Sequence, residues 1–278
     1  MGDRESLLAT LKNKACFCRK ETIRLIAIAK SGHYGSVFSA AEIFAVLYYH
    51  ALRYDPQRPD WPDRDRFILS KGHAAVGLYP ILADVGFFDP ALLDTYTRLG
   101  SPFGDHPDMR KIPGIDFSSG SLGHGLSVGV GMALAARVSK RSYRVYVLLG
   151  DGEMDEGQVW EAAMSAAHYK LGNLVAIVDR NRVSVDGPTA EVMDLEPLTT
   201  KWAAFGWQVQ EVDGHDLNAL LDRFAALPDP ASAEPTILIA HTVAGKPVSF
   251  MEHRFEWHLG YLAPDDQATA LAELEGGP

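Results

Sequence analysis

The sequence predicts an α/β fold, a three-layer arrangement in which a parallel β-sheet has helices on both faces. Short, fully apolar runs, such as VYVLL at 145–149 and LVAIV at 174–178, alternate with helical patterns. Strands that are apolar on both sides are typical of a parallel sheet between two helical layers. The 278 residues contain no repeat and no linker-like stretch, so we expect a single domain over residues 1–278.

The first third of the chain predicts three helices and one strand. Apolar residues recur at helical spacing over 4–30 and again over 40–52, which predicts two helices. Ser39, followed by Glu42, has the spacing of a capping box at the start of the second helix. Residues 66–70 (RFILS) predict a strand, and a helix over about 74–85 is expected after it.

From residue 143 onward, strands and helices alternate regularly. The expected strands and helices of this part lie, in chain order, at 145–149 (strand), 160–170 (helix), 174–178 (strand), 207–212 (strand), 216–227 (helix) and 236–240 (strand). A further helix is expected before this part, at 126–138. The segment 228–235 (PDPASAEP) is expected to be a surface loop, too short to separate two domains.

Composition excludes several classes of protein. Asp and Glu number 36 against 26 Lys and Arg, a net charge of −10, and this argues against a nucleic-acid-binding protein. No apolar stretch is long enough to span a membrane, and the charged N-terminus lacks the apolar core of a signal peptide. Cys16 and Cys18 provide no disulfide framework and no zinc pattern. We therefore expect a cytoplasmic protein.

Polar residues follow two of the apolar strands at their carboxyl ends. Asp151 lies between two glycines after 145–149, and Asn181 comes shortly after 174–178. Ligands of an open parallel sheet bind beyond the carboxyl ends of its strands. Mg²⁺ prefers oxygen ligands and commonly keeps phosphate oxygens in its shell, while Gly152 leaves room for an anion at the start of the next helix. This spacing predicts a Mg²⁺–diphosphate site, although Gly-Asp-Gly alone would indicate only a turn.

Histidines beside glycine or proline provide a second signal. Their neutral-range pKa suits hydrogen bonding and proton transfer, and none has the spacing of a zinc site. The loop histidines are His33, His73, His106 and His124, and His258 lies near the end of the chain. The remaining histidines that we expect to be structural are His50, His168, His215 and His241.

A glycine-rich segment, Gly120-Ser121-Leu122-Gly123-His124-Gly125, precedes an apolar helical pattern. It fits either a closely packed helix start or a backbone that approaches a flat cofactor. It is neither a Gly-x-Gly-x-x-Gly turn after a strand nor a Gly-Lys-Ser/Thr loop, so the sequence lacks a nucleotide-binding fingerprint.

In the order and spacing of these motifs, the chain resembles the N-terminal, diphosphate-binding portion of transketolase over essentially its full length. The matching motifs are Ser31-Gly32-His33, Leu69-Ser70-Lys71-Gly72-His73-Ala74, His106-Pro107, Gly120-Ser121-Leu122-Gly123-His124-Gly125, Gly150-Asp151-Gly152-Glu153-Met154-Asp155-Glu156-Gly157, Asp179-Arg180-Asn181-Arg182-Val183, Asp213-Gly214-His215-Asp216 and Trp257-His258.

The resemblance implies the thiamine diphosphate-binding fold, with thiamine diphosphate and Mg²⁺ or Ca²⁺ as cofactors. It implies that the metal is held by the side chains of Asp151 and Asn181 and by the backbone carbonyl of Val183. The residues that it implies for cofactor binding are His73, Gly120, Ser121, Leu122, Gly152, Glu153 and Asn181. The catalytic residues that it implies are His33, His106 and His258, which would face substrate hydroxyls, and Glu156, which would meet a subunit interface near the cofactor.

The resemblance also implies the reaction: transfer of a two-carbon ketol unit from a ketose phosphate, or a related sugar, to an aldose. A whole transketolase continues into a pyrimidine-binding domain and a C-terminal domain, whereas this sequence stops at Pro278. We therefore expect the N-terminal subunit of a split transketolase. Its expected partner is a C-terminal subunit, with self-association and two copies of each chain in the working enzyme, and its expected substrates are sugar phosphates.

Three alternatives stay open at this point. One is another thiamine diphosphate enzyme, such as a 2-oxo acid dehydrogenase alpha subunit or a deoxyxylulose-phosphate synthase. The set of four histidines, His33, His73, His106 and His258, matches transketolase better. The others are a catalytically silent binding homologue and an unrelated Mg²⁺-dependent phosphatase.

Overall fold

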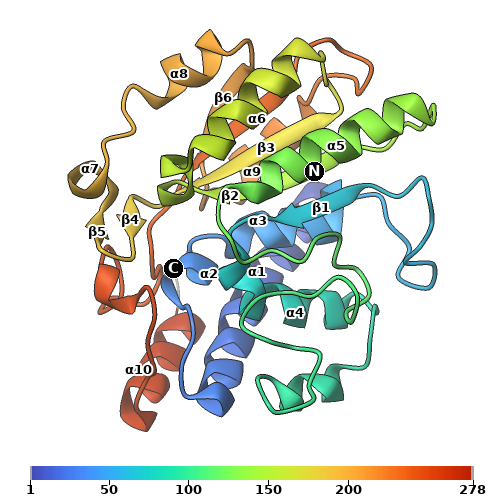
Figure 1. The fold of residues 1–278 in the computed structure, drawn as a ribbon. Helices are drawn as coiled ribbons and strands as arrows, with labels where there is room; N and C mark the ends of the chain where they lie inside the picture. The colour runs from blue at the N-terminus through green and yellow to red at the C-terminus, as the bar shows by residue number, and fades with distance from the viewer. Residues whose placement is uncertain (1, 277–278) are drawn as a thin grey trace.

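A five-stranded parallel sheet forms the centre of the computed structural model, which describes residues 2–276 (Figure 1). Met1, Gly277 and Pro278, at the ends of the predicted domain, lie outside the described residues. The strand order is β1-β2-β3-β7-β6, and every neighbouring pair is parallel. The strands are β1 Arg66–Leu69, β2 Val145–Gly150, β3 Leu174–Arg180, β6 Gln208–Asp213 and β7 Thr236–His241. The predicted fold class is confirmed, with all five strands close to their expected positions.

Helices cover both faces of this sheet. The helices of residues 2–276 are α1 Gly2–Ala29, α2 Gly35–Phe38, α3 Ala41–Val46, α4 Ala75–Asp84, α5 His124–Val138, α6 Gly157–His168, α7 Thr189–Val192, α8 Leu198–Ala204, α9 Leu217–Ala225 and α10 Pro264–Glu275. Shorter helical turns are η1 Leu47–Ala51, η2 Gly72–Ala74, η3 Pro90–Thr95, η4 Gly152–Asp155 and η5 Phe255–Trp257. A two-stranded antiparallel pair, β4 Val183–Ser184 and β5 Gly187–Pro188, follows the end of β3.

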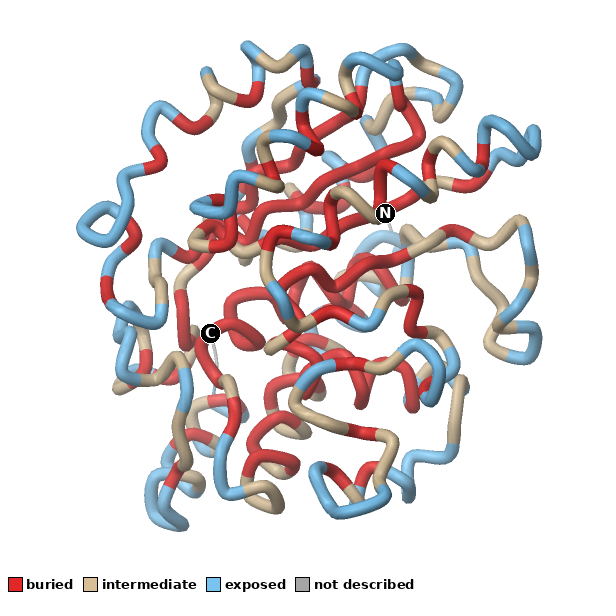
Figure 2. Tube along the Cα trace, in the orientation of Figure 1, coloured by how far each residue is buried: buried red, intermediate tan, exposed pale blue. Residues whose placement is uncertain are grey.

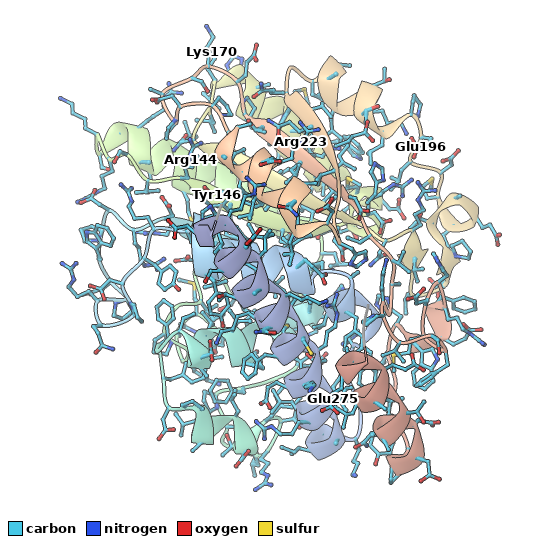
Figure 3. All side chains as sticks on the ribbon, turned by 180° about the vertical axis from the view of Figure 1, so that it is seen from behind. Arg144, Tyr146, Lys170, Glu196, Arg223 and Glu275 are labelled. Atoms are coloured by element: carbon cyan, nitrogen blue, oxygen red, sulfur yellow. The ribbon has the colours of Figure 1, made fainter. Side chains whose placement is uncertain are left out.

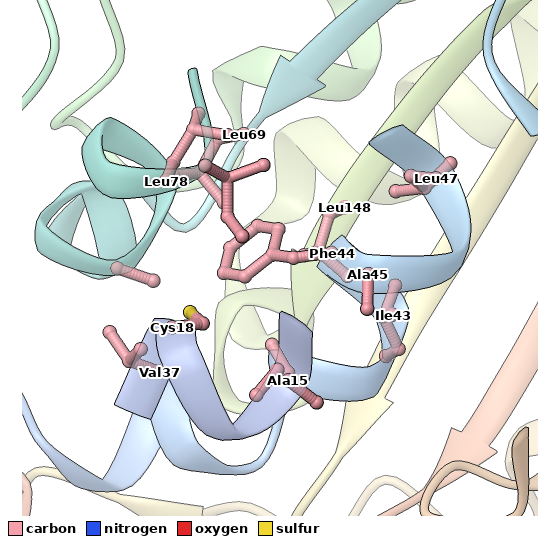
Figure 4. Close-up of a cluster of buried hydrophobic side chains, with 14 of the residues drawn as sticks. Ala15, Cys18, Val37, Ile43, Phe44, Ala45, Leu47, Leu69, Leu78 and Leu148 are labelled. Carbon is pink, nitrogen blue, oxygen red and sulfur yellow. The ribbon is translucent and has the colours of Figure 1, made fainter. Parts of the chain in front are cut away.

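Alternation along the strands divides the core into two layers. In β2, Tyr146 and Leu148 face the cluster that contains α1, α3, α4 and α9, whereas Val145, Val147 and Leu149 face α5, α6 and α8. Strand β3 is buried along its whole length and β2 at every position before Gly150 (Figure 2), and Figure 4 shows the first cluster. Full burial of an apolar side chain contributes about 1.5–3 kcal/mol, so both layers stabilise the sheet that positions the site.

The predicted capping box at Ser39 and Glu42 is wrong. Helix α3 follows Ala40 without a side-chain cap. The Ser39 hydroxyl instead donates to Asp179 Oδ2 at 2.5 Å, and the Glu42 carboxylate accepts hydrogen bonds from both terminal nitrogens of Arg19 at 2.7 and 2.6 Å. Both side chains are buried, and a buried polar group without a partner is costly. Tertiary partners therefore replace the local cap.

Within residues 2–276, no helix combines the length and the apolar character that crossing a bilayer requires. Both cysteines are free, with Cys16 half-buried and Cys18 buried.

Candidate functional site

The loops beyond the carboxyl ends of β1, β2 and β3 enclose a cavity of about 300 Å³. We call it the strand-end cavity. A larger cavity of about 580 Å³ lies between α1 and the start of α9, near α10. Figure 3, the view opposite to that of Figure 1, shows the side of the molecule where α1 and α10 lie. This larger cavity contains none of the predicted site residues. The strand-end cavity is lined by His33, Ser36, Lys71, His73, His106, Gly120, Leu122, Gly150, Asp151, Gly152, Glu153, Asn181, Val183, Ser184, Val185 and His258. Most of the predicted site residues, from segments far apart in the sequence, thus share one cavity.

Asp151 lies buried where β2 ends, and its oxygens accept hydrogen bonds from the backbone. Gly152 N donates to Oδ1 at 2.9 Å, and Arg182 N donates to Oδ2 at 2.6 Å. Arg180 Nη1 also approaches Oδ2, at 3.2 Å. Burial and the negative charge of Asp179 raise the pKa of Asp151 to about 6, although Arg180 acts in the opposite direction. A cation beside this carboxylate would relieve the cost of keeping it ionised.

Asn181 and Val183 extend this polar wall of the cavity. The Asn181 Nδ2 group donates to Ser39 Oγ at 3.2 Å and to Asp179 Oδ2 at 3.3 Å, which fixes the orientation of the amide. Its Oδ1 accepts from Val183 N at 3.0 Å. The amide is therefore held in one orientation at the cavity wall by two buried neighbours and by the backbone of β4.

The donor chemistry of this wall fits a hard divalent cation that also binds ligand oxygens. It offers one carboxylate at Asp151, one amide at Asn181 and the backbone of Val183. Over the described residues 2–276, no group of three or more His, Cys, Asp or Glu side chains could hold a metal on its own. Mg²⁺ in such sites is commonly bound by one or two carboxylates, with substrate phosphate oxygens completing the shell.

Glu153 ties the glycine-rich loop to the end of β2. Its carboxylate accepts hydrogen bonds from the Ser70 hydroxyl, from Gly123 N at 2.9 Å and from Gly150 N at 3.0 Å. Burial raises the pKa of Glu153, and these hydrogen bonds oppose that effect. Gly123 has φ +82°, and a Cβ there would lie 2.7 Å from Glu156 Cβ, so only glycine fits this close approach.

Three histidines form a cluster in the cavity. The ring centroids of His33, His73 and His258 are separated by 5.0, 5.2 and 5.4 Å. A backbone bridge between Gly32 and Gly260, with hydrogen bonds of 3.0 and 2.9 Å, joins the two chain segments that carry His33 and His258. This pairing connects residues more than two hundred positions apart.

Burial sets the charge of two of these histidines. Burial, followed by the positive charge of Lys71, lowers the pKa of His73 well below its usual value. Burial, followed by His33 and Lys71, lowers the pKa of His258 to about 4. At neutral pH both rings are uncharged, so each has one donor and one acceptor nitrogen for hydroxyl groups.

The other predicted site residues have different positions. His106 is partly exposed at the cavity, and its ring packs against Gly120, where a Cβ would lie 3.4 Å from it. Ser121 and Glu156 are exposed and lie outside the cavity lining, as does His124. Glu156 is nonetheless adjacent to the glycine-rich loop at Gly123. The roles of Ser121 and Glu156 therefore stay predictions.

The cavity has three polar lining residues that the sequence does not predict, Ser36, Lys71 and Ser184, and the first two of them are buried. The Ser36 hydroxyl is buried and has no hydrogen-bond partner within residues 2–276, so a ligand could supply one. Lys71 is buried, and its Nζ donates to the Ser36 carbonyl at 2.7 Å and to Asp179. Lys71 lies in the Ser70-Lys71-Gly72-His73 motif, which was a usable signal. Ser36 had no sequence signal beyond lying three residues after His33.

Comparison with known proteins gives a consistent result. A family model described as "Transketolase, thiamine diphosphate binding domain" matches residues 12–274. An apulose-4-phosphate transketolase subunit from Phocaeicola vulgatus is 43% identical, over 92% of this chain and 90% of its own length. The 6-deoxy-6-sulfo-D-fructose transketolase subunit SqwG from a Clostridium species is 42% identical, over 95% of this chain and 96% of its own length.

A solved structure extends the similarity to three dimensions. Transketolase from Leishmania mexicana superposes with a TM-score of 0.88 at 30% identity, covering 95% of this chain and 41% of that one. This chain thus spans nearly the whole of the two relatives named as subunits and about two fifths of this solved transketolase.

Proposed function

Because the chain belongs to the transketolase family through its thiamine diphosphate-binding domain, we propose that it is the N-terminal subunit of a split transketolase. With a C-terminal partner subunit, it transfers a two-carbon ketol unit from a ketose phosphate, or a related sugar, to an aldose. The observation that carries the proposal is that Asp151, Asn181 and the cluster of His33, His73 and His258 line one cavity in a chain that covers 90% and 96% of two named subunits.

The strand-end cavity is the proposed site for the diphosphate and its metal. Asp151 and Asn181 supply side-chain ligands to Mg²⁺ or Ca²⁺, and Val183 supplies a backbone carbonyl. Gly152 and His73 contact the diphosphate, and the hydroxyl of Ser36, which is buried without a partner within residues 2–276, is available to it. The segment Gly120–Leu122 contacts the body of the cofactor, and Glu153 holds that loop in position.

The histidines are the proposed groups for handling substrate hydroxyls and protons. The chemistry that thiamine diphosphate supplies when bound is a nucleophilic carbon and an electron sink for the two-carbon unit. Neutral His258, with its lowered pKa, can donate one hydrogen bond and accept another. His33 and His106 lie at the same cavity and can hold or move a proton at a hydroxyl.

The proposed partner covers the open side of the cofactor and supplies its pyrimidine site. Apolar side chains are exposed on the neighbouring helices, with Val138 of α5 at 84% and Met164 of α6 at 56%. A Cβ at Gly131 would meet nothing within 4 Å, so this face of α5 is open to close approach. We propose this face, with Glu156 and Trp160, as the docking surface. The chain alone would self-associate, and the working enzyme would hold two copies of each subunit.

The alternatives from the sequence are not favoured, because the relatives reported above are named transketolases or transketolase subunits. The proposal is tested by mixing the purified chain with a purified C-terminal transketolase subunit, thiamine diphosphate and Mg²⁺. Ketol transfer from a ketose phosphate to an aldose is expected from the mixture and not from either chain alone. A mixture without transfer to any aldose, from phosphorylated, sulfonated or branched donors, would contradict the proposal.

A further inference from the structure

Asp105 lies between two of the cavity histidines, next to the strand-end cavity. Its Oδ1 is 3.4 Å from His33 Nδ1, and its Oδ2 is 3.9 Å from His106 Nδ1. One carboxylate thus faces the same nitrogen of two rings that come from distant parts of the chain. The side chain is 40% exposed, so its charge is partly screened but not cancelled by solvent.

Two buried polar atoms beside Asp105 have no partner of normal hydrogen-bond geometry within residues 2–276. These are His33 Nδ1 and the hydroxyl of Tyr96. Burial, followed by the charge of Asp105, raises the pKa of Tyr96. Burial would raise the pKa of Asp105 itself, but His33, His106 and Tyr96 together lower it. The carboxylate is therefore ionised at neutral pH, with donors on several sides.

The charged and titratable groups around this pair are few. His33 also faces His73 and His258, at centroid distances of 5.0 and 5.4 Å, and burial with Lys71 keeps both of those rings neutral. Asp105 also acts electrostatically on Tyr79, which is buried. Among residues 2–276, Asp105 is the carboxylate that lies within 4.0 Å of His33 and of His106.

A carboxylate at Nδ1 controls which nitrogen of a neutral imidazole carries the proton. A negative charge 3.4 Å from Nδ1 of His33 favours the tautomer that carries its proton on that nitrogen, which leaves the other nitrogen without one. With the proton held on Nδ1, the nitrogen that accepts a proton is Nε2, and the carboxylate stabilises the cation that forms when Nε2 is protonated.

We propose that Asp105 is a positioning residue for the ketol transfer proposed above: its charge holds a proton on Nδ1 of His33 and leaves Nε2 of that ring as the basic nitrogen. The inference rests on the proposed function for its purpose, but the position of the proton on His33 is a property of this chain that can be measured without activity. Asp105 acts through His33 and is not itself a catalytic residue.

The first test is independent of activity. The chain is labelled with ¹⁵N-histidine, and the imidazole nitrogens are observed by NMR at a pH where the rings are neutral. In the wild type, the Nδ1 signal of His33 is expected in the protonated range. Asp105→Asn is expected to shift this signal toward a mixture of tautomers. Asp108→Asn, a matched charge removal in the same loop at a carboxylate that pairs with Arg110, is expected to leave it unchanged. An unchanged His33 signal in Asp105→Asn would overturn the proposal.

The second test measures kinetics of the chain reconstituted with its C-terminal partner. A positioned acid–base group contributes about 10²–10⁴-fold to a rate. Asp105→Asn leaves the histidine in place and removes only the charge that orients its proton, so we expect kcat to fall by about 10–100-fold with little change in KM. Asp105→Glu is expected to recover most of the rate, and Asp108→Asn to behave as the wild type. An active wild type with an equally active Asp105→Asn variant refutes the role of Asp105. A wild type without any ketol transfer refutes the proposed function instead, and the NMR result then stands by itself.

Discussion

Replacing Asp151 with alanine is expected to abolish metal-dependent binding of thiamine diphosphate without unfolding the chain. Removal of the carboxylate leaves two backbone donors, Gly152 N and Arg182 N, without their acceptor, whereas Arg180 Nη1 keeps its hydrogen bond to Thr189 Oγ1. A buried donor that loses its acceptor costs about 1–3 kcal/mol. Water that enters the cavity can accept from these two donors, so we expect their combined cost near the lower end of that range for each.

An opposing effect comes from the charge of the carboxylate itself. Burial and Asp179 raise the pKa of Asp151 from 3.8 to about 6. A group whose pKa is raised on folding binds its proton more tightly in the folded state, so its ionisation destabilises the metal-free chain. The penalty is absent below the unfolded pKa, grows as the pH rises to about 6, and reaches about 3 kcal/mol at neutral pH. The two effects have opposite sign and similar size, so we expect the free energy of unfolding to change by less than about 2 kcal/mol.

Binding should change far more than stability. Substitution of a residue that hydrogen-bonds to a metal ligand lowers the affinity for the metal by about 10–100-fold. Loss of a residue that binds the metal directly is therefore expected to lower this affinity by at least about 100-fold. Calorimetric titration of the reconstituted complex with thiamine diphosphate and Mg²⁺ measures this, and urea unfolding measures stability. Asp155→Asn, an exposed carboxylate at the end of η4, is the control. If Asp151→Ala binds thiamine diphosphate and Mg²⁺ with wild-type affinity, Asp151 is not a metal ligand and the proposed site is wrong.

Three further substitutions test the account. Glu42→Gln breaks a buried ion pair with Arg19 and should cost about 3 kcal/mol of stability at pH 6 in urea unfolding. Burial raises the pKa of Glu42, but the pairing with Arg19 outweighs burial and the pKa is lowered to about 2. The wild type should therefore lose the stability that the ion pair contributes as the pH falls from about 4.5 toward about 2. A Glu42→Gln variant whose stability falls with pH as the wild type's does would contradict this role of the ion pair. His258→Ala should lower kcat of the reconstituted complex by about 10²–10⁴-fold with much less effect on cofactor affinity. Near-normal turnover in this variant would show that His258 has a structural and not a catalytic role. Gly123→Ala should destabilise the chain by about 1–3 kcal/mol because of its positive φ and the 2.7 Å approach, whereas the control Gly131→Ala, in an open helix position, should stabilise it by up to about 1 kcal/mol; equal effects would contradict this.

The sequence predicts well those elements that depend on residues close together in the chain. Apolar runs predict the five strands, because buried parallel strands are apolar on both faces. The helical spacing of apolar residues predicts α1. Asp151 and Asn181 were predicted to lie together because the carboxyl ends of parallel strands share one edge of the sheet, and β2 and β3 are neighbours.

Tertiary contacts account for what the sequence missed. Ser39 bonds to Asp179, 140 positions away, and Glu42 bonds to Arg19, so local spacing predicted a cap that does not form. Ser36 lies three residues after His33, and Asp105 directly precedes His106, but nothing in the local sequence shows that either side chain faces the cavity or its histidines. Their surroundings depend on which loops meet at the cavity, and the bridge between Gly32 and Gly260 that brings His33 beside His258 is invisible to local patterns.

The most direct test of the central claim is ketol transfer by reconstituted subunits. The purified chain, a purified C-terminal transketolase subunit, thiamine diphosphate and Mg²⁺ are assayed separately and together with a ketose phosphate donor and an aldose acceptor, and products are identified by mass spectrometry. A product extended by two carbons is expected only when both subunits and both cofactors are present. Full activity from this chain by itself, with contaminants excluded, would contradict the account.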